Sequence, residues 1–237
     1  MNSMDSLYIV MPAYNEEEAI RDVVREWYSC LACASDDSRL LVDISGSTDQ
    51  TETILRTMQH DYPKLRILTG GRKEHGPKLI RLYRTAALAG ADYVFQTDSD
   101  GQTNPFEFAP FWDARKDHPV QLGWRLVRGD GFARKIIEDV LCFILLLIFQ
   151  VRIPDSNAPF RLMRTDLLKR YLKYLPSDYP IPNVMLSVWF SAYREPLAFR
   201  EITFRPRQGG KNSLNLGRII RIGISSISGF LHFRRKL

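Results

Sequence analysis

The sequence contains few cysteines, with only Cys30, Cys33 and Cys142 among 237 residues. Three thiols cannot form a disulfide framework, so small disulfide-stabilised secreted proteins are excluded and a reducing compartment is expected. Cys30 and Cys33 form a C-x-x-C pair, but no second Cys or His pair follows at the spacing of a zinc site. The pair is therefore interpreted as structural.

Long apolar runs are also missing. The longest, Val140–Phe149, has ten residues, whereas a helix that crosses a bilayer needs about 20. The N-terminal segment MNSMDSLYIV has neither a basic region nor an apolar stretch of signal length. We therefore expect neither a transmembrane helix nor a secretory signal.

Acidic residues are absent from the last part of the chain. No Asp or Glu follows Glu201, whereas eight of the 33 Lys and Arg residues lie from Arg205 onward. The preceding residues hold 25 basic against 27 acidic side chains, a net charge of −2, although the whole chain carries +6. This local excess indicates an anionic surface or substrate. No nucleic-acid partner is expected, because the aromatic and basic interleaving of an RNA-binding module is missing.

The composition is otherwise globular, with 45% hydrophobic and 25% charged residues, which excludes whole-chain disorder and coiled coil. In the first half, short apolar segments alternate with segments of helical periodicity. The expected strands are residues 7–11, 40–43, 65–68 and 93–97. Strands that alternate with helices of this kind predict an α/β fold with a mostly parallel sheet and helices on both faces. We expect Asn15 to cap the first helix.

The pattern changes after residue 118. The elements expected there are a strand at 120–124, a helix at 131–151, a loop at 154–159, helices at 165–174 and 182–193, and a strand at 197–204. We interpret residues 1–205 as one domain and residues 206–237 as a C-terminal extension. In the extension, Asn212–Lys236 predicts a basic amphipathic helix that binds an anionic membrane surface. A helix packed on the core, or a protein contact, is the alternative.

Two motifs follow expected strands. Asp98-Ser99-Asp100 comes directly after the strand at 93–97, and carboxylates at a strand's carboxyl end can face one cavity. Such hard oxygen ligands suit Mg²⁺ or Mn²⁺, which can bridge two phosphate oxygens. The alternative is a solvated acidic turn before the helix that follows Pro105. The second motif, Pro12-Ala13-Tyr14-Asn15-Glu16, could hold a nucleobase by its face and edge, or could simply end a strand.

In their order and spacing, these motifs resemble those of family 2 glycosyltransferases with a GT-A, Rossmann-like fold. The resemblance covers about residues 6–205 and continues through Gly76-Pro77, Gly90-Ala91-Asp92, Gly123-Trp124-Arg125, Asp130–Lys135 and Asp155–Arg164. The sequence is most similar to the branch that contains dolichol-phosphate mannosyltransferase and bacterial polyprenyl-phosphate glycosyltransferases. Membership of that branch implies a nucleotide-sugar donor and a lipid phosphate acceptor.

The resemblance also implies roles for matching residues. A UDP- or GDP-sugar would be bound by Pro12, Tyr14, Glu16, Asp43 and Asp98. The metal, Mg²⁺ or Mn²⁺, would be held by Asp98, Asp100 and Gln102. Arg125 and Arg134 would bind the acceptor phosphate, because guanidinium groups make bidentate contacts with phosphate. Asp155, Asn157 and Arg161 would shape the wall near the sugar or fix their loop.

The sequence departs from the family pattern at two places. Ile44 and Ser45 stand where acidic residues usually follow the second strand, which leaves the choice between uridine and guanosine open. Glu138 stands where the mannosyltransferase pattern has a serine, four residues after Arg134. A carboxylate would repel an acceptor phosphate, so Glu138 must turn away or the acceptor must differ.

The resulting interpretation is a metal-dependent, inverting glycosyltransferase that acts on a polyprenyl phosphate, with Asp98, Asp100 and Asp155 as catalytic residues. It would lie peripherally on the cytoplasmic face of a membrane, and Val140–Phe149 would be a core or an interfacial helix. A same-fold enzyme that acts on a hydroxyl of a glycan or lipid would need a base, such as Asp155 or Asp178. A non-catalytic partner of a membrane enzyme is the other alternative.

Overall fold

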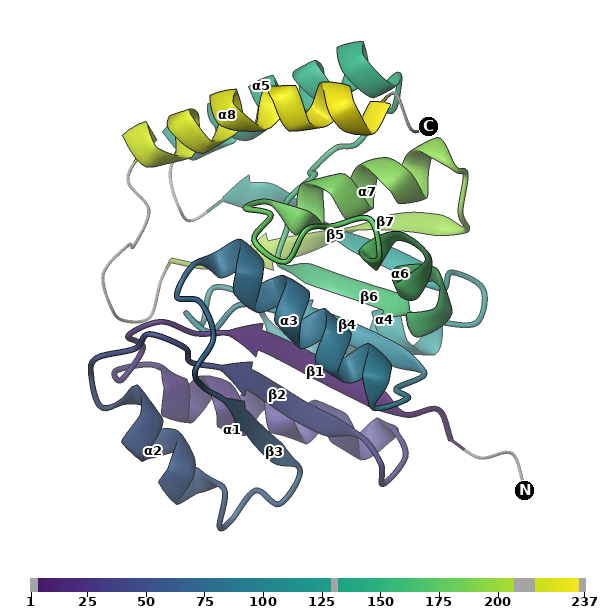
Figure 1. The fold of residues 1–237 in the computed structure, drawn as a ribbon. Helices are drawn as coiled ribbons and strands as arrows, with labels where there is room; N and C mark the ends of the chain where they lie inside the picture. Colours follow the sequence, from purple (N-terminus) through teal and green to yellow (C-terminus); the bar gives the residue numbers. More distant parts are fainter. Residues whose placement is uncertain (1–3, 129–131, 207–215, 235–237) are drawn as a thin grey trace.

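A computed structural model describes residues 4–128, 132–206 and 216–234, which form a seven-stranded sheet with helices on both faces (Figure 1). The strands are β1 (Leu7–Pro12), β2 (Arg39–Asp43), β3 (Leu65–Leu68), β4 (Tyr93–Thr97), β5 (Val120–Arg128), β6 (Phe160–Arg164) and β7 (Leu197–Phe204). Their order is β3-β2-β1-β4-β6-β5-β7. All neighbouring pairs are parallel except the two that β6 makes with β4 and β5. The expected mostly parallel α/β sheet is confirmed.

Strand β6 was not expected from the sequence. It lies near the middle of the sheet, antiparallel to β4, with Phe160 opposite Thr97. Its first four residues are buried, and helix α6 begins directly after it at Thr165. Because no turn residue separates this strand from the helix, the sequence does not mark where one element ends and the next begins.

Eight α-helices lie in the described residues. They are α1 (Ile20–Ser29), α2 (Thr51–Met58), α3 (His75–Leu88), α4 (Phe108–Asp113), α5 (Phe132–Phe149), α6 (Thr165–Leu172), α7 (Pro182–Ala192) and α8 (Leu216–Arg234). Short 3₁₀ helices span Cys30–Cys33 and Pro105–Glu107. Helices α3, α6 and α7 cover one face of the sheet, while α1 and α4 lie behind it (Figure 1). Each face therefore has its own hydrophobic core.

The prediction that Asn15 caps the first helix is wrong. Helix α1 begins at Ile20, and Asn15 has a φ of 54°. The Asn15 side chain instead accepts a hydrogen bond from the Thr48 N–H (2.8 Å) and donates to the Thr48 hydroxyl (3.2 Å). Asparagine tolerates this left-handed conformation better than most residues. Asn15 thus joins the loops that follow β1 and β2.

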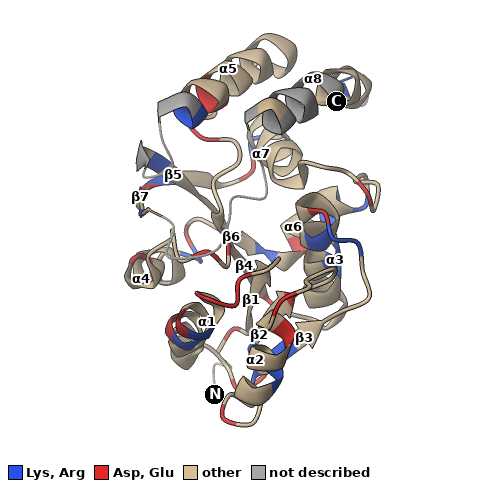
Figure 2. Ribbon diagram, turned by 90° about the vertical axis from the view of Figure 1, so that its left-hand side faces the viewer, with Lys and Arg blue, Asp and Glu red and all other residues tan. Residues whose placement is uncertain are grey.

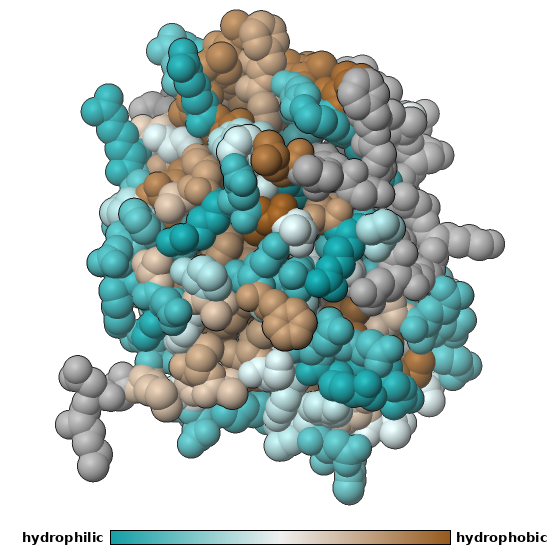
Figure 3. All heavy atoms as spheres, turned by 180° about the vertical axis from the view of Figure 1, so that it is seen from behind, coloured by the Kyte–Doolittle hydropathy of each residue, from teal (hydrophilic) through white to brown (hydrophobic). Residues whose placement is uncertain are grey.

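The apolar run of helix α5 was expected to lie either in the core or at the surface, and its residues are divided between the two. Leu145 and Phe149 are buried, but Ile136, Val140, Phe143 and Leu147 are 46%, 52%, 59% and 63% exposed. These four residues recur at helical spacing on one side of the helix, and we call them the apolar stripe. The charged residues of α5 lie in its N-terminal half (Figure 2). Apolar atoms gather at this end of the molecule (Figure 3).

Helix α8 runs beside α5 (Figure 1). Phe230 and Phe233 are buried, with the Phe230 ring 6.1 Å from that of Phe149 and the Phe233 ring 5.3 Å from that of Trp189. Of the basic helix expected over Asn212–Lys236, the segment Leu216–Arg234 is helical, and the remaining residues lie outside the described ranges. Within those ranges, no helix is long and apolar enough to cross a bilayer.

Candidate active site

The two sequence motifs meet at the carboxyl ends of adjacent parallel strands, β1 and β4. The Ser99 hydroxyl donates a hydrogen bond of 3.0 Å to the Pro12 carbonyl, which holds the two strand ends together. Tyr14 is half-buried, and Glu16 is buried with its N–H on the Thr51 hydroxyl at 2.9 Å. Ligands of open α/β sheets bind at such strand ends. The structure therefore brings both motifs into one site.

The acidic motif is anchored by its own loop and by the segment after β7. An Asp100 carboxylate oxygen accepts the Gln102 N–H at 3.2 Å. The Gln102 side-chain amide donates to the Arg205 carbonyl at 2.9 Å, and the Arg205 N–H donates to the Gln102 carbonyl at 2.8 Å. Asp100 is 9% exposed, and the Asp98 side chain is 25% exposed. Both carboxylates are thus held at the rim of the sheet.

His75 was not predicted from the sequence, although it lies beside the acidic motif. Its Nε2 is 4.0 Å from an Asp98 oxygen. Burial of the ring, followed by the positive charge of Lys78, lowers the pKa of His75, even though 47% of its side chain is exposed. A neutral imidazole can offer a nitrogen lone pair to a metal or a hydrogen bond to a ligand.

The residues at this site fit a metal that is shared with a substrate. Among the residues that the structure describes, no group of three His, Cys, Asp or Glu side chains could hold an ion by itself. Mg²⁺ is usually bound in proteins by one or two carboxylates, with substrate phosphates and waters completing its coordination. Asp98 and Asp100 supply that donor set, so a diphosphate would have to provide the further ligands.

Lys78 is a second functional candidate that the sequence did not reveal. Only 2% of Lys78 is exposed; its ammonium donates to the Ala13 carbonyl and lies 5.4 Å from the centre of the Tyr14 ring. Burial lowers the pKa of Lys78 to about 8, although the charges of Asp43, Glu16 and Glu74 oppose the shift. Lys78 thus fixes the turn that carries Tyr14 and places a cation under it.

We expect Lys78→Met to flatten the pH dependence of the unfolding free energy. In the unfolded chain a lysine keeps its proton up to about pH 10.4, whereas folded Lys78 loses it near pH 8. Between these values the unfolded state binds more protons, so wild-type stability rises with pH, by up to about 3 kcal/mol. Urea unfolding at pH 7.5, 9 and 10.5 measures the difference between wild type and variant. Lys169→Met, at an exposed position, should keep the wild-type slope; equal slopes for wild type and Lys78→Met would contradict the prediction.

Asp43, expected at the base of the nucleotide, is completely buried. One of its oxygens accepts from the Ser45 N–H (3.0 Å) and hydroxyl (2.6 Å), and the other from Arg81 at 3.3 Å. Arg81 also donates to the Thr69 carbonyl at 2.9 Å. A nucleobase could contact the Asp43 carboxylate only by displacing these partners, so Ser45 and Arg81 stand between Asp43 and any ligand.

A second charged cluster surrounds Arg125, which lies in the C-terminal half of β5. Its Nε and Nη2 donate to the two Asp155 oxygens at 2.7 and 2.8 Å, and its guanidinium lies 5.0 Å from the centre of the Phe204 ring. The Glu138 carboxylate does not point away from this cluster: one of its oxygens is 3.9 Å from Arg125 Nη2. Its other oxygen accepts from the Ser156 N–H (2.8 Å) and hydroxyl (2.7 Å). Arg125 therefore faces two carboxylates.

The remaining predicted residues lie around this cluster. Arg134 is half-buried in the first turn of α5, one helical turn before Glu138. Asn157 is exposed, and its N–H donates to Asp155 at 3.3 Å. Arg161 is completely buried and fixes the loop rather than lining a ligand site. Its guanidinium donates to the carbonyls of Ser156, Ala158 and Asn183, at 2.6, 2.9 and 2.8 Å.

The chain is similar to known glycosyltransferases. It is 24% identical to dodecaprenyl-phosphate galacturonate synthase of Rhizobium johnstonii, over 97% of this chain and 68% of that protein. It is 26% identical to the UDP-N-acetylglucosamine–dolichyl-phosphate N-acetylglucosaminyltransferase of Methanococcus voltae, over 69% and 71% of the two chains.

The fold is similar to that of glucosyl-3-phosphoglycerate synthase from Mycobacterium tuberculosis in complex with Mn²⁺, uridine diphosphate and phosphoglyceric acid. The TM-score is 0.70 at 18% identity, over 97% of this chain and 78% of that one. This similarity identifies the sheet and its helices as a GT-A fold. Residues 8–172 match the family model for glycosyl transferase family 2. Because that match covers more than half of the chain, the protein belongs to glycosyl transferase family 2 and is a glycosyltransferase.

Proposed function

We propose that this glycosyltransferase is metal-dependent and inverting, and that it transfers a sugar from a nucleotide-sugar to a polyprenyl phosphate. The observation that carries the proposal is the junction of β1 and β4, where Ser99 bonds to Pro12 and Asp98 and Asp100 lie beside the Tyr14 turn. Two similar proteins are named for dodecaprenyl- or dolichyl-phosphate acceptors, which supports the choice of acceptor.

At the donor end, Tyr14 and Glu16 would contact the nucleoside, with Lys78 holding the turn beneath them. Asp98 and Asp100 would hold Mg²⁺ or Mn²⁺ on the diphosphate. The bound metal would stabilise the negative charge that develops on the leaving nucleoside diphosphate. Solved structures of similar fold contain Mn²⁺ with UDP-glucose, which supports this assignment.

At the acceptor end, Arg125 and Arg134 would orient the acceptor phosphate. A phosphate is already anionic near neutral pH, so it needs no strong general base, and a single displacement at C1 inverts the anomeric configuration. The donor and acceptor ends are joined by the β7 segment, since Gln102 bonds to Arg205 and the neighbouring Phe204 ring lies on Arg125.

The pairing of Arg125 favours one second candidate. Asp155 already accepts hydrogen bonds from Nε and Nη2 of Arg125, and a Glu138 oxygen lies 3.9 Å from Nη2. A site of this kind could instead receive a hydroxyl of a glycan or lipid, with Asp155 as the general base. Assays with a polyprenyl phosphate and with the matching polyprenol, under the same donor and metal, separate the two acceptors.

Glu138→Gln tests the phosphate acceptor directly. Two unit charges 4 Å apart interact by about 1–4 kcal/mol in water or near a protein surface. Removing the Glu138 charge should therefore lower KM for the polyprenyl phosphate about tenfold, with kcat little changed. Asp139→Asn makes the same charge change at the next position, which is exposed and paired with Lys135, and should leave KM unchanged. A higher KM in Glu138→Gln would favour the hydroxyl acceptor.

The donor site is tested by thermal unfolding with UDP-, GDP-, CDP- and ADP-sugars, each with Mn²⁺ or with a chelator. A ligand that binds the native state raises Tm according to its concentration relative to Kd. We expect one nucleotide to raise Tm, and the shift to disappear on chelation. If no nucleotide and metal pair raises Tm, the donor site is wrong and a non-catalytic partner of a membrane enzyme becomes the better description.

We also propose that the protein binds peripherally to the cytoplasmic face of a membrane. The exposed apolar stripe of α5 supports binding to a membrane surface, as does the basic sequence of Asn212–Lys236. Apolar side chains that enter the interface beside basic residues are typical of peripheral membrane helices. Flotation with vesicles that contain or lack anionic lipids would measure the contribution of each.

A further inference from the structure

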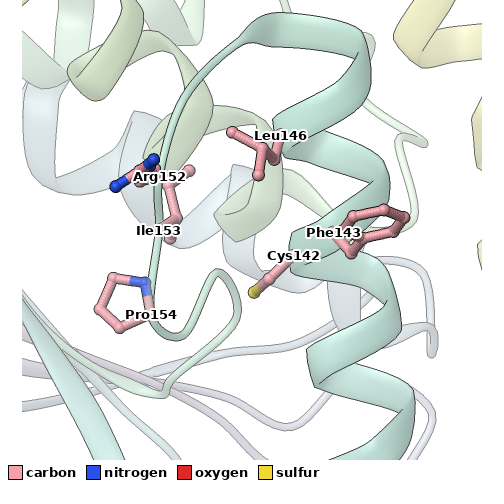
Figure 4. A pocket seen from close by; sticks show the side chains of 6 residues that line it. All are labelled: Cys142, Phe143, Leu146, Arg152, Ile153 and Pro154. Carbon is pink, nitrogen blue, oxygen red and sulfur yellow. The ribbon is translucent and has the colours of Figure 1, made fainter.

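A shallow pocket of about 340 Å³ lies between α5 and the segment that follows it (Figure 4). It is lined by Cys142, Phe143, Leu146, Arg152, Ile153 and Pro154. Its volume is at the lower end of the range of about 300–1,000 Å³ for small-molecule sites. Of the described residues that line it, four are apolar, one carries a thiol and one a guanidinium, and none carries a carboxylate.

The thiol of Cys142 does not add charge to this pocket. Burial raises the pKa of Cys142 to about 12, so the group stays protonated at neutral pH. A neutral thiol behaves as a small apolar side chain. Among its described lining residues, the pocket therefore offers hydrocarbon contacts and one positive charge, that of Arg152.

Arg152 is exposed, and among the described residues it forms no ion pair or hydrogen bond. This distinguishes it from Arg125, whose guanidinium is already bound by Asp155. An unpaired guanidinium is well suited to a phosphate, which it can contact through two parallel hydrogen bonds. The rim of an otherwise apolar pocket thus carries a cation available to an anion.

The pocket continues into the exposed surface of α5 and lies beside the charged cluster around Arg125. Phe143 belongs both to the pocket and to the apolar stripe. On the inner side, the Cys142 sulfur is 3.5 Å from the Glu138 carboxylate that faces Arg125. Pro154 directly precedes Asp155 in the chain. A molecule in the pocket would therefore connect the outer surface with the charged cluster.

We propose that this pocket binds the hydrocarbon chain of a lipid monophosphate, the acceptor, and that Arg152 contacts its phosphate as the lipid enters. The inference rests on the proposed function and adds a binding residue to it. A shallow pocket whose described lining is apolar, with the Arg152 cation at its rim, matches an amphiphile with one anionic end. Free phosphate would leave the apolar walls without a partner.

Dodecyl phosphate, kept below its micelle concentration, tests the proposal by calorimetric titration of the full chain without donor or metal. We expect it to bind the wild type at least tenfold more tightly than inorganic phosphate, dodecanol or lysophosphatidylglycerol. The last of these is a phosphodiester and represents a bilayer lipid. Equal or tighter binding of any of the three would overturn the proposal, as would no binding of dodecyl phosphate.

Two pairs of variants separate the pocket from non-specific binding. Arg152→Gln should weaken dodecyl phosphate binding at least tenfold, whereas Arg21→Gln, on exposed α1 surface, should not. Phe143→Ser should weaken it likewise, whereas Leu88→Ser, at a position 88% exposed on α3, should not. Phe143 and Arg152 are both exposed, so neither change removes a core contact. Unchanged affinity in Arg152→Gln overturns the assignment.

The binding titration does not depend on catalysis, and a comparison with transfer kinetics separates this proposal from the proposed function. If the wild type transfers sugar to a polyprenyl phosphate with the same KM as Arg152→Gln, this pocket is not the acceptor's path and the proposed function stands. If dodecyl phosphate binds through Arg152 but no lipid phosphate is glycosylated, the pocket stands and the proposed acceptor chemistry fails.

Discussion

Asp100→Asn is expected to lower kcat for sugar transfer by about 10³-fold. The substitution keeps the shape of the side chain and an oxygen for the Gln102 N–H, but removes the negative charge that a divalent metal requires. Loss of the metal would leave the charge on the departing diphosphate unstabilised. The measurement is kcat with the nucleotide-sugar identified by thermal unfolding, together with the Mn²⁺-dependent rise of Tm, which should also disappear.

Asp117→Asn is the matched control, because Asp117 is exposed and distant in sequence from both motifs. It should retain wild-type kcat. The free energy of unfolding of Asp100→Asn should stay within about 1 kcal/mol of wild type, since asparagine keeps an oxygen that accepts the Gln102 N–H. An Asp100→Asn protein that transfers sugar at a near wild-type rate would remove Asp100 from the catalytic site.

Arg161→Met is expected to cost about 3 kcal/mol or more of unfolding free energy, the largest stability effect foreseen for this chain. Methionine fills the space of the arginine stem, but the carbonyls of Ser156, Ala158 and Asn183 each lose a charged donor in a buried site. The single Ser187 hydroxyl, which contacts both the Ser156 and the Asn183 carbonyl at 2.9 Å, cannot replace all three donors. Each unsatisfied buried acceptor costs about 1–3 kcal/mol. Urea unfolding at neutral pH gives the change from the shift of the midpoint at constant slope.

Arg164→Met provides the contrast. Arg164 lies three residues further along, with 42% of its side chain exposed, and pairs with Asp166 at 2.6 Å. An exposed ion pair contributes about 0–1 kcal/mol, so this variant should unfold close to wild type. Equal losses for the two variants would show that the three carbonyls find other donors. Arg161→Met should also perturb Asp155, because Ser156 adjoins it.

The sequence predicted the strands whose ends are marked by polar or turn residues. Residues 65–68 and 93–97 were expected as strands and are β3 and β4 with the same bounds. Strand β6 was not predicted, because it continues into α6 without an intervening turn. Asn15 was assigned to a helix cap because its preference for caps is local, whereas its partner, Thr48, belongs to another loop and depends on the parallel pairing of β1 and β2.

The candidate site was predictable where strand order alone determines proximity. Pro12 is the last residue of β1 and Asp98 directly follows β4, and the parallel fold places these two strands side by side. Lys78 and His75 were not predictable as site residues, since charged and polar residues are usually exposed and nothing local distinguishes these two. The conflict between Glu138 and Arg125 was visible in the sequence, but only the structure shows that Ser156 holds the carboxylate in place.

The position of β6 also affects how the chain can fold during synthesis. Strands β1 to β4 can pair in the order in which they leave the ribosome, but the free edge of β4 pairs only with β6. Ribosomes add about 5–20 residues per second, so β6 is synthesised several seconds after β4. During that interval the β4 edge is unpaired, and its residues include Val94 and Phe95, which are buried in the folded protein. An unpaired apolar strand edge is a template for association between chains. The nascent protein thus has a limited interval in which a chaperone that shields the β4 edge would raise the yield of folded enzyme.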